Sequence, residues 1–581
     1  MRKPRYLLVA LPAVLAASLT LAGCTGAVVD AISTTTTERS TSSTDAETVA
    51  VVENGDPTAT TSAVLAANED STVVTDDEWD ESAAVDITLT GSSATSASDD
   101  VTVDAASVTI TAAGVYRLSG NLEGSVTVAA PEDAQVVLIL DGANITSGDT
   151  AAIAVTSADD VAVILADGSS NSLSDSATSA EDAEINAALF SEADLTIAGN
   201  GSLTVEGNGN DGITSEDDLV ISSGRITVTA ADDALRGKDS LTVSGGTLDL
   251  TAAGDGITSD NEDDATRGYI YVTGGTITVD ASGDAVAAAT DVLISGGDLD
   301  LTAGGGSAAS VSDDTSAKGV KAGVYVVVDG GTLVVSAADD ALHSDSVVHI
   351  AGGELTLATG DDGVHAESAL RIDAGSTTIV DSYEGLESAA ITVADGVVDI
   401  TSSDDGFNGS SGTSTGGGGG MQSTGETVVI SGGTVTVDAE GDGLDSNGTL
   451  EISGGTITVL GPTTSGNGAL DSGGGITVSG GTLLAVGSSG MIESPGSDSA
   501  QGWLAVTASA SAGSTVTISD SSGAVVAEYT VDKSFASVVF SSTAIVNGST
   551  YEVSVDGSAV NVTAGTAASG GGGMQAPGGR R

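Results

Sequence analysis

The sequence predicts an all-β fold, a parallel β-helix (a solenoid) with about 22 residues per rung. Three observations predict it. An acidic residue, then Gly or Ala, then an apolar residue recurs over residues 211–444, mostly at intervals of 22; Lys318-Gly319-Val320 and Gly468-Ala469-Leu470 follow the same pattern without the acid. A Gly-Gly pair recurs between these triplets. The segments between the markers are short runs rich in Val, Ile and Thr, which are typical of strands.

The third position of the triplet is apolar in every copy, which predicts one column of side chains pointing into the core. Its members are Ile213, Leu235, Ile257, Val286, Val320, Leu342, Val364, Leu386, Phe407, Leu444 and Leu470. The preceding position is Gly or Ala throughout, as expected where the backbone turns or packs closely. Leucine-rich repeats would need a recurring Leu/Asn pattern, and a calcium-binding roll would need a nonapeptide period; neither is found.

The first residues have the pattern of an export signal. A basic start precedes an apolar run from Tyr6 to Leu21, and Cys24 follows directly. Residues 1–23 resemble a bacterial lipoprotein signal peptide, which implies cleavage before Cys24 and a diacylglycerol on its thiol. We therefore expect a lipid-anchored protein on the extracellular face of the cytoplasmic membrane. The alternative is an ordinary secretion signal followed by an incidental cysteine.

Composition divides the remaining chain into four parts. Residues 24–80 are rich in Ser, Thr and acids without periodicity, which predicts a flexible tether. Residues 81–500 form the predicted β-helix. Residues 501–566 concentrate aromatics and are expected to form a small β unit, either a cap on the open end of the solenoid or an appended domain. Residues 567–581 are expected to be a Gly-rich tail, and we expect a monomer.

The charge balance narrows the class of partner. The chain has 82 acidic and 15 basic residues and a formal charge of −67. Nucleic acid is excluded as a partner, because phosphate binding needs Lys and Arg. Cations are favoured instead. The single cysteine excludes an internal disulfide framework.

Acidic residues at the turn of each rung predict calcium sites. Stacking places these carboxylates about 4.8 Å apart, where two charges repel by about 1 kcal/mol even in water. Calcium, the one cofactor we expect, takes six to eight oxygens in flexible geometry and would relieve this repulsion. The candidate ligands are Asp211, Asp232, Asp233, Asp255, Asp339, Asp340, Asp361, Asp362, Glu384, Asp404 and Asp405. The alternative is that Asp favours turns and forms hydrogen-bonded ladders.

A polar stripe next to this column is the candidate carbohydrate site. Its members are Lys321, His343, His365, Glu387 and Asn408, and Lys318 and Tyr383 complete the candidate carbohydrate-binding residues. Side chains repeating at rung spacing suit the repeated hydroxyl and carboxylate groups of a glycan. With 2% aromatic residues, recognition would rest on polar contacts and bridging calcium. The alternatives are a solvated face without ligand, or a zinc site formed by His343, His365 and Glu387.

We assign no catalytic residues from the sequence. Many β-helices cleave polyuronates by β-elimination, which needs a base and calcium. Lys318 and Lys321 are the candidates for such a base, but no acid/base constellation accompanies them, and charge compensation is the simpler interpretation. Paired carboxylates for a hydrolase carry no signal in so acidic a chain.

Several long motifs in order also resemble a known family over about residues 87–502. They include Gly254-Asp255-Gly256-Ile257, Ala317-Lys318-Gly319-Val320-Lys321-Ala322, Ser382-Tyr383-Glu384-Gly385-Leu386-Glu387 and Asp404-Asp405-Gly406-Phe407-Asn408. The chain resembles the clostridial-type calcium-binding carbohydrate-binding β-helix family. The resemblance implies a right-handed β-helix similar to polysaccharide lyases, bound calcium, affinity for cellulose-like or acidic polysaccharides, and no established cleavage. Its calcium positions transfer to the acidic turn column.

The leading interpretation is therefore calcium-dependent, non-catalytic polysaccharide binding at the cell surface. A calcium-dependent polyuronate lyase of the pectate type is the second. A structural or adhesive surface rod without glycan affinity is the third.

Overall fold

The structure is a computed structural model that describes residues 55–148, 150–177, 183–312, 315–411 and 425–567. The chain divides into two units, residues 1–47 and 48–581, and every described residue belongs to the second. The predicted signal peptide, Cys24, the first part of the predicted tether and nearly all of the Gly-rich tail lie outside the described residues.

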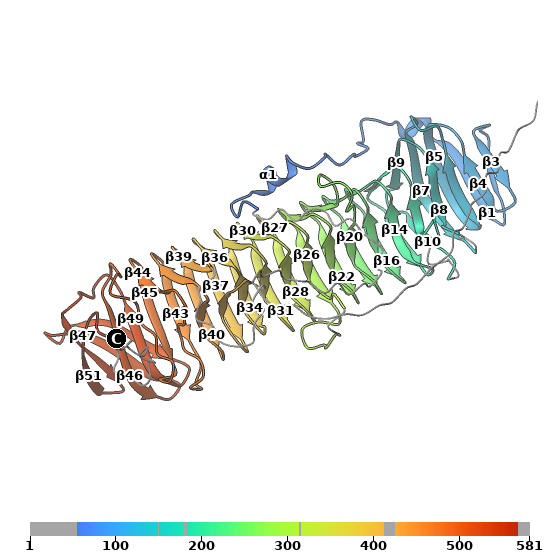
Figure 1. Cartoon of the computed structure of the whole chain (residues 1–581). Helices are drawn as coiled ribbons and strands as arrows, with labels where there is room; N and C mark the ends of the chain where they lie inside the picture. The colour runs from blue at the N-terminus through green and yellow to red at the C-terminus, as the bar shows by residue number, and fades with distance from the viewer. Residues whose placement is uncertain (1–54, 149, 178–182, 313–314, 412–424, 568–581) are drawn as a thin grey trace, which may run out of the picture. The chain divides into compact units, whose positions relative to one another are not determined.

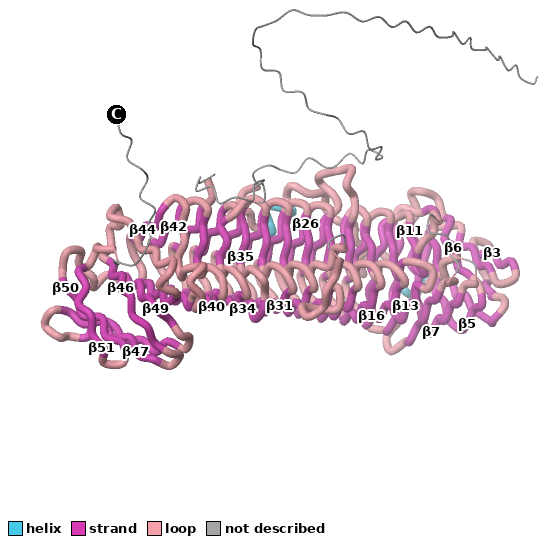
Figure 2. The backbone as a smooth tube through the Cα atoms, turned by 60° about the horizontal axis from the view of Figure 1, so that its bottom comes forward, coloured by secondary structure: helices cyan, strands magenta, loops and turns pink. Residues whose placement is uncertain are grey.

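The described chain is all-β, and its strands form two long, mainly parallel sheets of 32 and 15 strands (Figure 1). This arrangement agrees with the predicted solenoid. Figure 2 shows the strands of successive coils side by side in rows, with rows of turns between them. Within the described ranges, no helix has the length and apolar character needed to cross a membrane.

The 32-stranded sheet contains two ladders that share the long strand β7. Its other strands are antiparallel: β2 (Ala94–Ser96) beside the first strand, and β46 (Trp503–Ala510) and β49 (Phe535–Ser541) at the C-terminal end. The first ladder runs through β1 (Val85–Gly91), β5 (Gly114–Glu123), β7 (Val136–Thr146), β9 (Asp160–Leu165), β12 (Asp194–Gly199), β15 (Asp218–Ile221), β18 (Ser240–Val243), β21 (Tyr269–Val272), β24 (Asp291–Ile294), β27 (Tyr325–Val328), β30 (Val347–Ile350), β33 (Ala369–Ile372), β36 (Ala390–Val393), β39 (Thr427–Ile430), β42 (Thr449–Ile452) and β44 (Gly475–Val478). The second runs from β7 through β10 (Ser170–Ser174), β13 (Ser202–Gly207), β16 (Arg225–Ala230), β19 (Thr247–Ala252), β22 (Thr276–Ala281), β25 (Asp298–Ala303), β28 (Thr332–Ala337), β31 (Glu354–Thr359), β34 (Ser376–Asp381), β37 (Val397–Ser402), β40 (Thr434–Ala439), β43 (Thr456–Leu460) and β45 (Thr482–Gly487).

The 15-stranded sheet is the third ladder and is made of shorter strands. It runs through β3 (Val101–Asp104), β4 (Ser107–Ile110), β6 (Ser125–Ala129), β8 (Ile153–Ser157), β11 (Ala187–Ser191), β14 (Asp211–Ser215), β17 (Leu235–Gly237), β20 (Ile257–Ser259), β23 (Val286–Ala288), β26 (Val320–Ala322), β29 (Leu342–Ser344), β32 (Val364–Ala366), β35 (Leu386–Ser388), β38 (Phe407–Gly409) and β41 (Leu444–Ser446). Each full coil thus contributes one strand to each ladder.

The register of the third ladder stacks equivalent positions of successive coils. Leu342 pairs with Val364, and Val364 pairs with Leu386, so each partner lies 22 positions along the chain. The predicted inward column is buried: Ile257, Leu342, Val364, Leu386 and Phe407 are 0% exposed. These side chains belong to one continuous hydrophobic core, because every coil presents its apolar file to the same interior.

The end of the predicted tether is packed against the first ladder, which corrects the expectation that residues 24–80 are free along their whole length. Residues 55–84 include a short helix, α1 (Thr61–Leu65), and a 3-10 turn, η1 (Glu81–Ala83). Val64 packs against Leu293 and Val327. The backbone N–H of Thr72 donates to Asp218 at 2.8 Å. We call residues 55–84 the strap; scattered contacts such as these hold it without any periodic pattern.

The C-terminal residues form two groups of antiparallel strands. β49 (Phe535–Ser541) pairs with β45, the last strand of the second ladder, and β46 (Trp503–Ala510) pairs with β49. A separate four-stranded sheet contains β47 (Ser514–Asp520), β48 (Val525–Val531), β50 (Thr550–Val555) and β51 (Ser558–Thr563). The two groups share a hydrophobic cluster that includes Phe540 and Tyr551.

Candidate functional site

The acidic turn column lies where each coil bends from the second ladder into the third. Asp233, for example, follows β16 and precedes β17. Glycine follows the acidic residue in most coils because the bend is crowded: a Cβ at Gly406 would lie 2.2 Å from Cγ1 of Val437 in the next coil. The repeat therefore sets both the bend and the direction of the carboxylate before it. We call this row of acidic residues the turn column.

Carboxylates of the turn column form a hydrogen-bonded ladder along the solenoid. Oδ1 of Asp233 accepts the backbone N–H of Asp255 at 2.7 Å, and Oδ1 of Asp255 accepts that of Asp284 at 2.7 Å. Oδ1 of Asp284 accepts the N–H of Lys318 at 2.7 Å. The structural alternative raised from the sequence, an aspartate ladder, is therefore present. The ladder uses one oxygen of each of these carboxylates. The second oxygen is also bonded at some positions: Oδ2 of Asp284 accepts from Oγ of Ser316 at 2.9 Å, and Oδ2 of Asp211 accepts from Oγ1 of Thr214 at 3.0 Å.

Burial raises the pKa of several carboxyls in this column. The pKa values of Asp233 and Asp405 rise to about 8, and those of Asp211 and Asp255 to about 6. Desolvation is the main cause, and repulsion by neighbouring carboxylates adds to it. Glu384 behaves in the same way, with a pKa raised to about 7. The column holds more negative charge than its surroundings compensate.

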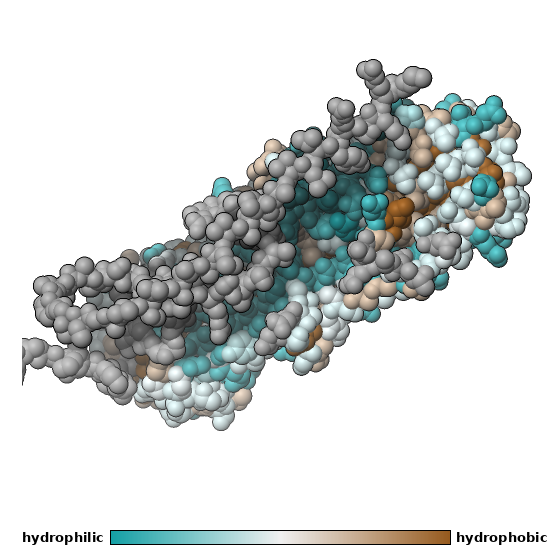
Figure 3. Space-filling view, turned by 45° about the vertical axis from the view of Figure 1, so that its right-hand side comes forward, coloured by the Kyte–Doolittle hydropathy of each residue, from teal (hydrophilic) through white to brown (hydrophobic). Residues whose placement is uncertain are grey.

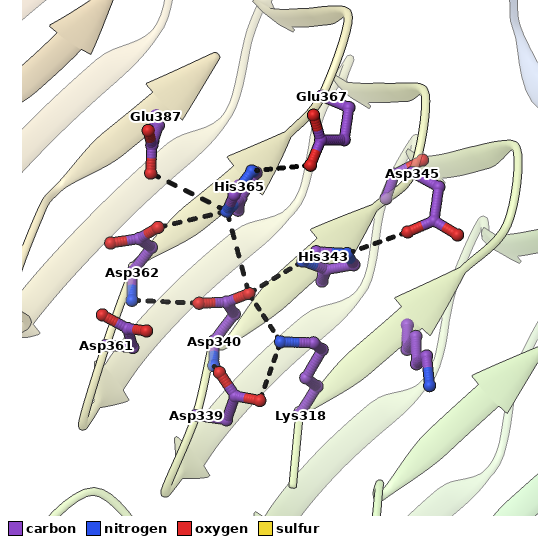
Figure 4. A network of polar contacts seen from close by, with 12 residues as sticks. Lys318, Asp339, Asp340, His343, Asp345, Asp361, Asp362, His365, Glu367 and Glu387 are labelled. Carbon is purple, nitrogen blue, oxygen red and sulfur yellow. Dashed lines mark hydrogen bonds and ion pairs between the residues drawn. The ribbon is translucent and has the colours of Figure 1, made fainter. Parts of the chain in front are cut away.

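The middle of the column is different because a lysine lies in it. Nζ of Lys318 donates to Oδ2 of Asp339 and to Oδ2 of Asp340, both at 2.8 Å (Figure 4). Burial opposes the charge of Lys318, but Asp340 and Asp339 outweigh it and raise its pKa. Asp340 is 2% exposed and Asp362 is 5% exposed. In this stretch the chain compensates part of its own charge.

The polar stripe predicted from the sequence lies on the outer side of the third ladder. Lys321 pairs with His343, His343 with His365, His365 with Glu387, and Glu387 with Asn408. The two imidazole rings are 5.0 Å apart between centroids. These five residues therefore form one continuous row, which we call the polar stripe.

Each imidazole of the polar stripe reaches back to a turn-column carboxylate. Nδ1 of His343 lies 2.8 Å from Oδ2 of Asp340, and its Nε2 lies 3.1 Å from Oδ1 of Asp345. Nδ1 of His365 lies 3.2 Å from Oδ2 of Asp362 (Figure 4). Figure 3 shows extensive hydrophilic surface over the central coils of the face that it presents.

Tyr383 is the exposed aromatic of the site. Tyr383 occupies the position in its coil that Asp361 occupies in the preceding coil and Asp404 in the next. The backbone bonds show this, because the N–H of Tyr383 donates to the carbonyl of Asp361 and its carbonyl accepts from the N–H of Asp404. The side chain is 48% exposed. A hydrogen bond to the Asp404 carboxylate is the main reason that the pKa of Tyr383 is raised to about 12. An exposed ring beside carboxylates suits the apolar face of a sugar.

The structure gathers the predicted site residues into three consecutive stretches rather than one site. Asp211, Asp232, Asp233 and Asp255 lie in the first. Asp339, Asp340, Asp361 and Asp362 lie with Lys318, His343 and His365 in the second. Glu384, Asp404 and Asp405 lie with Tyr383, Glu387 and Asn408 in the third. Lys321 lies between the first two, with Nζ 3.3 Å from Oδ2 of Asp284.

Two acidic stretches provide pairs of carboxylates held against a glycine of the next coil. A Cβ at Gly254 would lie 2.3 Å from Oδ1 of Asp232 and 2.6 Å from Oδ1 of Asp233. A Cβ at Gly441 would lie 2.3 Å from Oδ1 of Asp404 and 2.4 Å from Oδ1 of Asp405. In both places glycine leaves room for two carboxylate oxygens to approach each other. Oxygen pairs of this kind fit the donor set that calcium prefers.

One acidic group was not predicted from the sequence. Asp194, Asp217 and Asp218 bring carboxylate oxygens within 4.8 Å of one another at the bends between the third and first ladders. They line a cavity of about 190 Å³ together with Arg267 and strap residues such as Glu69. The strap supplies part of this lining, so the repeat alone does not reveal the cavity. The doublet Asp217-Asp218 was its one sequence signal.

The fold and the site together define the class of this protein: it is a parallel β solenoid with a column of carboxylates and an adjoining polar stripe on its surface. The chain matches the family described as "carbohydrate-binding domain-containing protein" over residues 104–363. It is also similar to a solved structure, the "polysaccharide lyase-like protein from C. thermocellum, Gadolinium derivative". Identity there is 36%, the match covers 42% of this chain and 95% of that chain, and the TM-score is 0.39. No curated protein matches the chain. The chain belongs to the carbohydrate-binding domain-containing family.

Proposed function

We propose that this protein binds polysaccharide without cleaving it, and that calcium held by the turn column is required for binding. Family membership supports a polysaccharide ligand. The observation that carries the calcium requirement is the excess of buried carboxylates whose pKa is raised, such as Asp233 and Asp405, each to about 8. A divalent cation offsets that charge without requiring the carboxyls to protonate.

Calcium would be held at the two carboxylate pairs that face a glycine. Asp232 and Asp233 with Asp255 would hold one ion, and Asp404 and Asp405 with Asp442 another. Among the described residues, the lysines that pair with the turn column are Lys318 and Lys321, with Asp284, Asp339 and Asp340, and the histidines are His343 and His365, with Asp340 and Asp362. None of these ion pairs involves the two proposed calcium groups. Bound calcium would supply positive charge to an acidic or hydroxyl-rich glycan that this protein would otherwise repel.

The glycan would lie along the polar stripe and over Tyr383. The donors Lys321, His343 and Asn408 and the acceptor Glu387 repeat at the spacing of coils. The exposed ring of Tyr383 adds an apolar surface beside this row, in the coil that carries Glu387. A cellulose-like or acidic chain matches this combination of repeated polar groups and one stacking ring.

A calcium-dependent polyuronate lyase is the second candidate, favoured by the 36% identity to a protein described as polysaccharide lyase-like. β-Elimination needs a neutral base near the sugar C5 proton. Lys318 is a poor base here, because Asp339 and Asp340 hold its proton and raise its pKa. Nζ of Lys321 is 3.3 Å from the Asp284 carboxylate. These contacts favour binding over cleavage.

The finer features of the architecture are proposals as well. We propose a right-handed β-helix with about 22 residues per rung, supported by partners such as Leu342 and Val364 at that separation. We propose that residues 501–566 cap its C-terminal end, since β49 pairs with the otherwise open edge of β45. We also propose export and lipid anchoring through Cys24, from the signal-like sequence before it.

One experiment with polygalacturonate separates these functions. The soluble chain from residue 25 onward is passed over immobilised polygalacturonate and over cellulose, with calcium and then with EDTA, while absorbance of unsaturated products is followed. Retention that requires calcium, without product, supports the proposal. A calcium-dependent rise in absorbance would establish the lyase instead. Absence of retention on any polysaccharide in calcium would leave the adhesive rod.

A further inference from the structure

We propose that Asp362, His365 and Glu387 form a binding site for a divalent transition-metal ion, with zinc as the best match, and that one ligand position of this ion is open to solvent. This site is distinct from the calcium positions proposed above, which contain oxygen ligands alone. It lies at the junction of the turn column and the polar stripe (Figure 4).

The three side chains come from neighbouring coils that the third ladder holds in register. His365 in β32 pairs directly with Glu387 in β35, and Asp362 lies at the bend just before β32. One ligand atom from each lies within 4.8 Å of the other two. Nδ1 of His365 is 3.2 Å from Oδ2 of Asp362 and 3.8 Å from Oε2 of Glu387.

These separations are close to those of a tetrahedral ion. Bonds of about 2.0–2.1 Å place tetrahedral ligands roughly 3.3–3.5 Å apart. The two separations differ from that range by a few tenths of an ångström, which small side-chain rotations can close. Rigid strands hold both ends of the site, so the backbone need not move.

The donor set selects the kind of ion. Calcium and magnesium prefer oxygen ligands, whereas imidazole nitrogen suits zinc and its neighbours. Three protein ligands with a fourth position left open is the arrangement of zinc sites that bind water or a substrate group. The side chains of His365 and Glu387 are 21% and 19% exposed, whereas Asp362 is 6% exposed. The open position therefore faces the side from which a glycan would approach.

A further carboxylate lies near the other nitrogen of the imidazole. Nε2 of His365 lies 3.8 Å from Oε1 of Glu367, on the side of the ring away from the proposed ion. A metal-binding histidine usually directs its other N–H to a carboxylate, which fixes the ring and leaves the metal-facing nitrogen unprotonated. Glu367 would play this part once a small side-chain rotation brought its carboxylate within hydrogen-bond distance of Nε2, which would leave Nδ1 of His365 free to bind the ion.

A competing group, formed by Asp340, His343 and His365, is less suitable. Its Asp340 Oδ2 already accepts a hydrogen bond from Lys318 Nζ at 2.8 Å, so an ion there would face a positive charge. Asp362 and Glu387 have no such contact with Lys318 among the described ion pairs.

The test is a calorimetric titration of zinc into the calcium-saturated chain, with three single variants. We expect one zinc ion per chain that excess calcium does not displace. His365→Gln and Glu387→Gln should each weaken zinc binding by roughly 100-fold or more, since each removes a ligand. His343→Gln should leave zinc affinity unchanged, because that ring belongs to the competing group.

Three results would overturn the proposal: no zinc binding, displacement of zinc by calcium, or a loss in His343→Gln equal to that in His365→Gln. Circular dichroism and the calcium stoichiometry of each variant, read in the same experiment, report whether it is folded. Because zinc is titrated without any glycan, failure here leaves the proposed polysaccharide binding untouched. Failure of calcium or glycan binding, in turn, does not remove the zinc signal.

Discussion

Replacing Asp405 with Asn tests whether the turn column is strained by its own charge. Oδ1 of Asp405 accepts the backbone N–H of Asp442 at 2.5 Å, and the carbonyl of an asparagine side chain can keep that bond. The substitution removes one charge facing Asp404, Asp442 and Asp445, which are the carboxyls that raise its pKa beyond the effect of burial. In calcium-free buffer at high pH the variant should therefore be more stable than the wild type.

The size of the effect follows from the pKa. The pKa of Asp405 rises from 3.8 to about 8 on folding, so the folded protein holds this proton more tightly than the unfolded chain. Stability therefore falls as pH rises through that interval, and the loss is complete above its upper end. A shift of one pKa unit corresponds to ~1.4 kcal/mol, and partial exposure reduces the total, which gives about 1–3 kcal/mol at pH 9.

The assay is urea unfolding of both proteins in EDTA at acidic pH and at pH 9, and then in calcium. The amide introduced by Asp405→Asn cannot ionise, so the variant should show a flatter pH dependence in EDTA and a smaller gain from calcium. Asp399→Asn, at an exposed aspartate of the same coil, is the matched control and should follow the wild type. If Asp405→Asn makes the protein less stable than the wild type in EDTA at pH 9, the charge-strain reasoning is refuted.

Three further predictions follow from the same geometry. Gly254→Ala should lower the calcium stoichiometry by one ion, because its Cβ would occupy the space of the Asp232 and Asp233 carboxylates. The control variant Gly466→Ala, whose Cβ meets open space, should keep the full stoichiometry. Equal stoichiometry in both variants would contradict this prediction. Phe407→Ala removes a ring that is 0% exposed in the core, and it should lower the free energy of unfolding by about 3–5 kcal/mol in urea titrations. A loss below about 1 kcal/mol would argue against an inward column of apolar side chains. Tyr383→Ala should weaken glycan binding by about 1 kcal/mol in affinity measurements without changing stability, and an unchanged affinity would remove Tyr383 from the site.

The features tied to the repeat could be predicted from the sequence. Strict apolar occupancy at positions such as Leu342 and Phe407 predicted an inward column, and the register confirms that these positions stack. The same periodicity correctly predicted that Lys321, His343, His365 and Glu387 follow one another on the outside. A spacing that returns each residue to the same place in the coil is sufficient for this.

Features that depend on contacts outside the repeat could not be predicted. The strap has no periodicity, and isolated residues such as Val64 hold it against the first ladder. The cluster of Asp194, Asp217 and Asp218 becomes a cavity only when strap residues close over it. Nor does the spacing indicate which carboxylates a lysine neutralises; Lys318 reaches Asp339 and Asp340 in the following coil. Side-chain direction, not spacing, decides this.

Crystals soaked in calcium test the central claim most directly, through an anomalous difference map recorded at long wavelength. We predict peaks between the carboxylates of Asp404 and Asp405 and of Asp232 and Asp233, each beside the glycine of the next coil. A map without a peak at either pair, in protein that still binds polysaccharide, would contradict the claim that the turn column holds the ions on which binding depends.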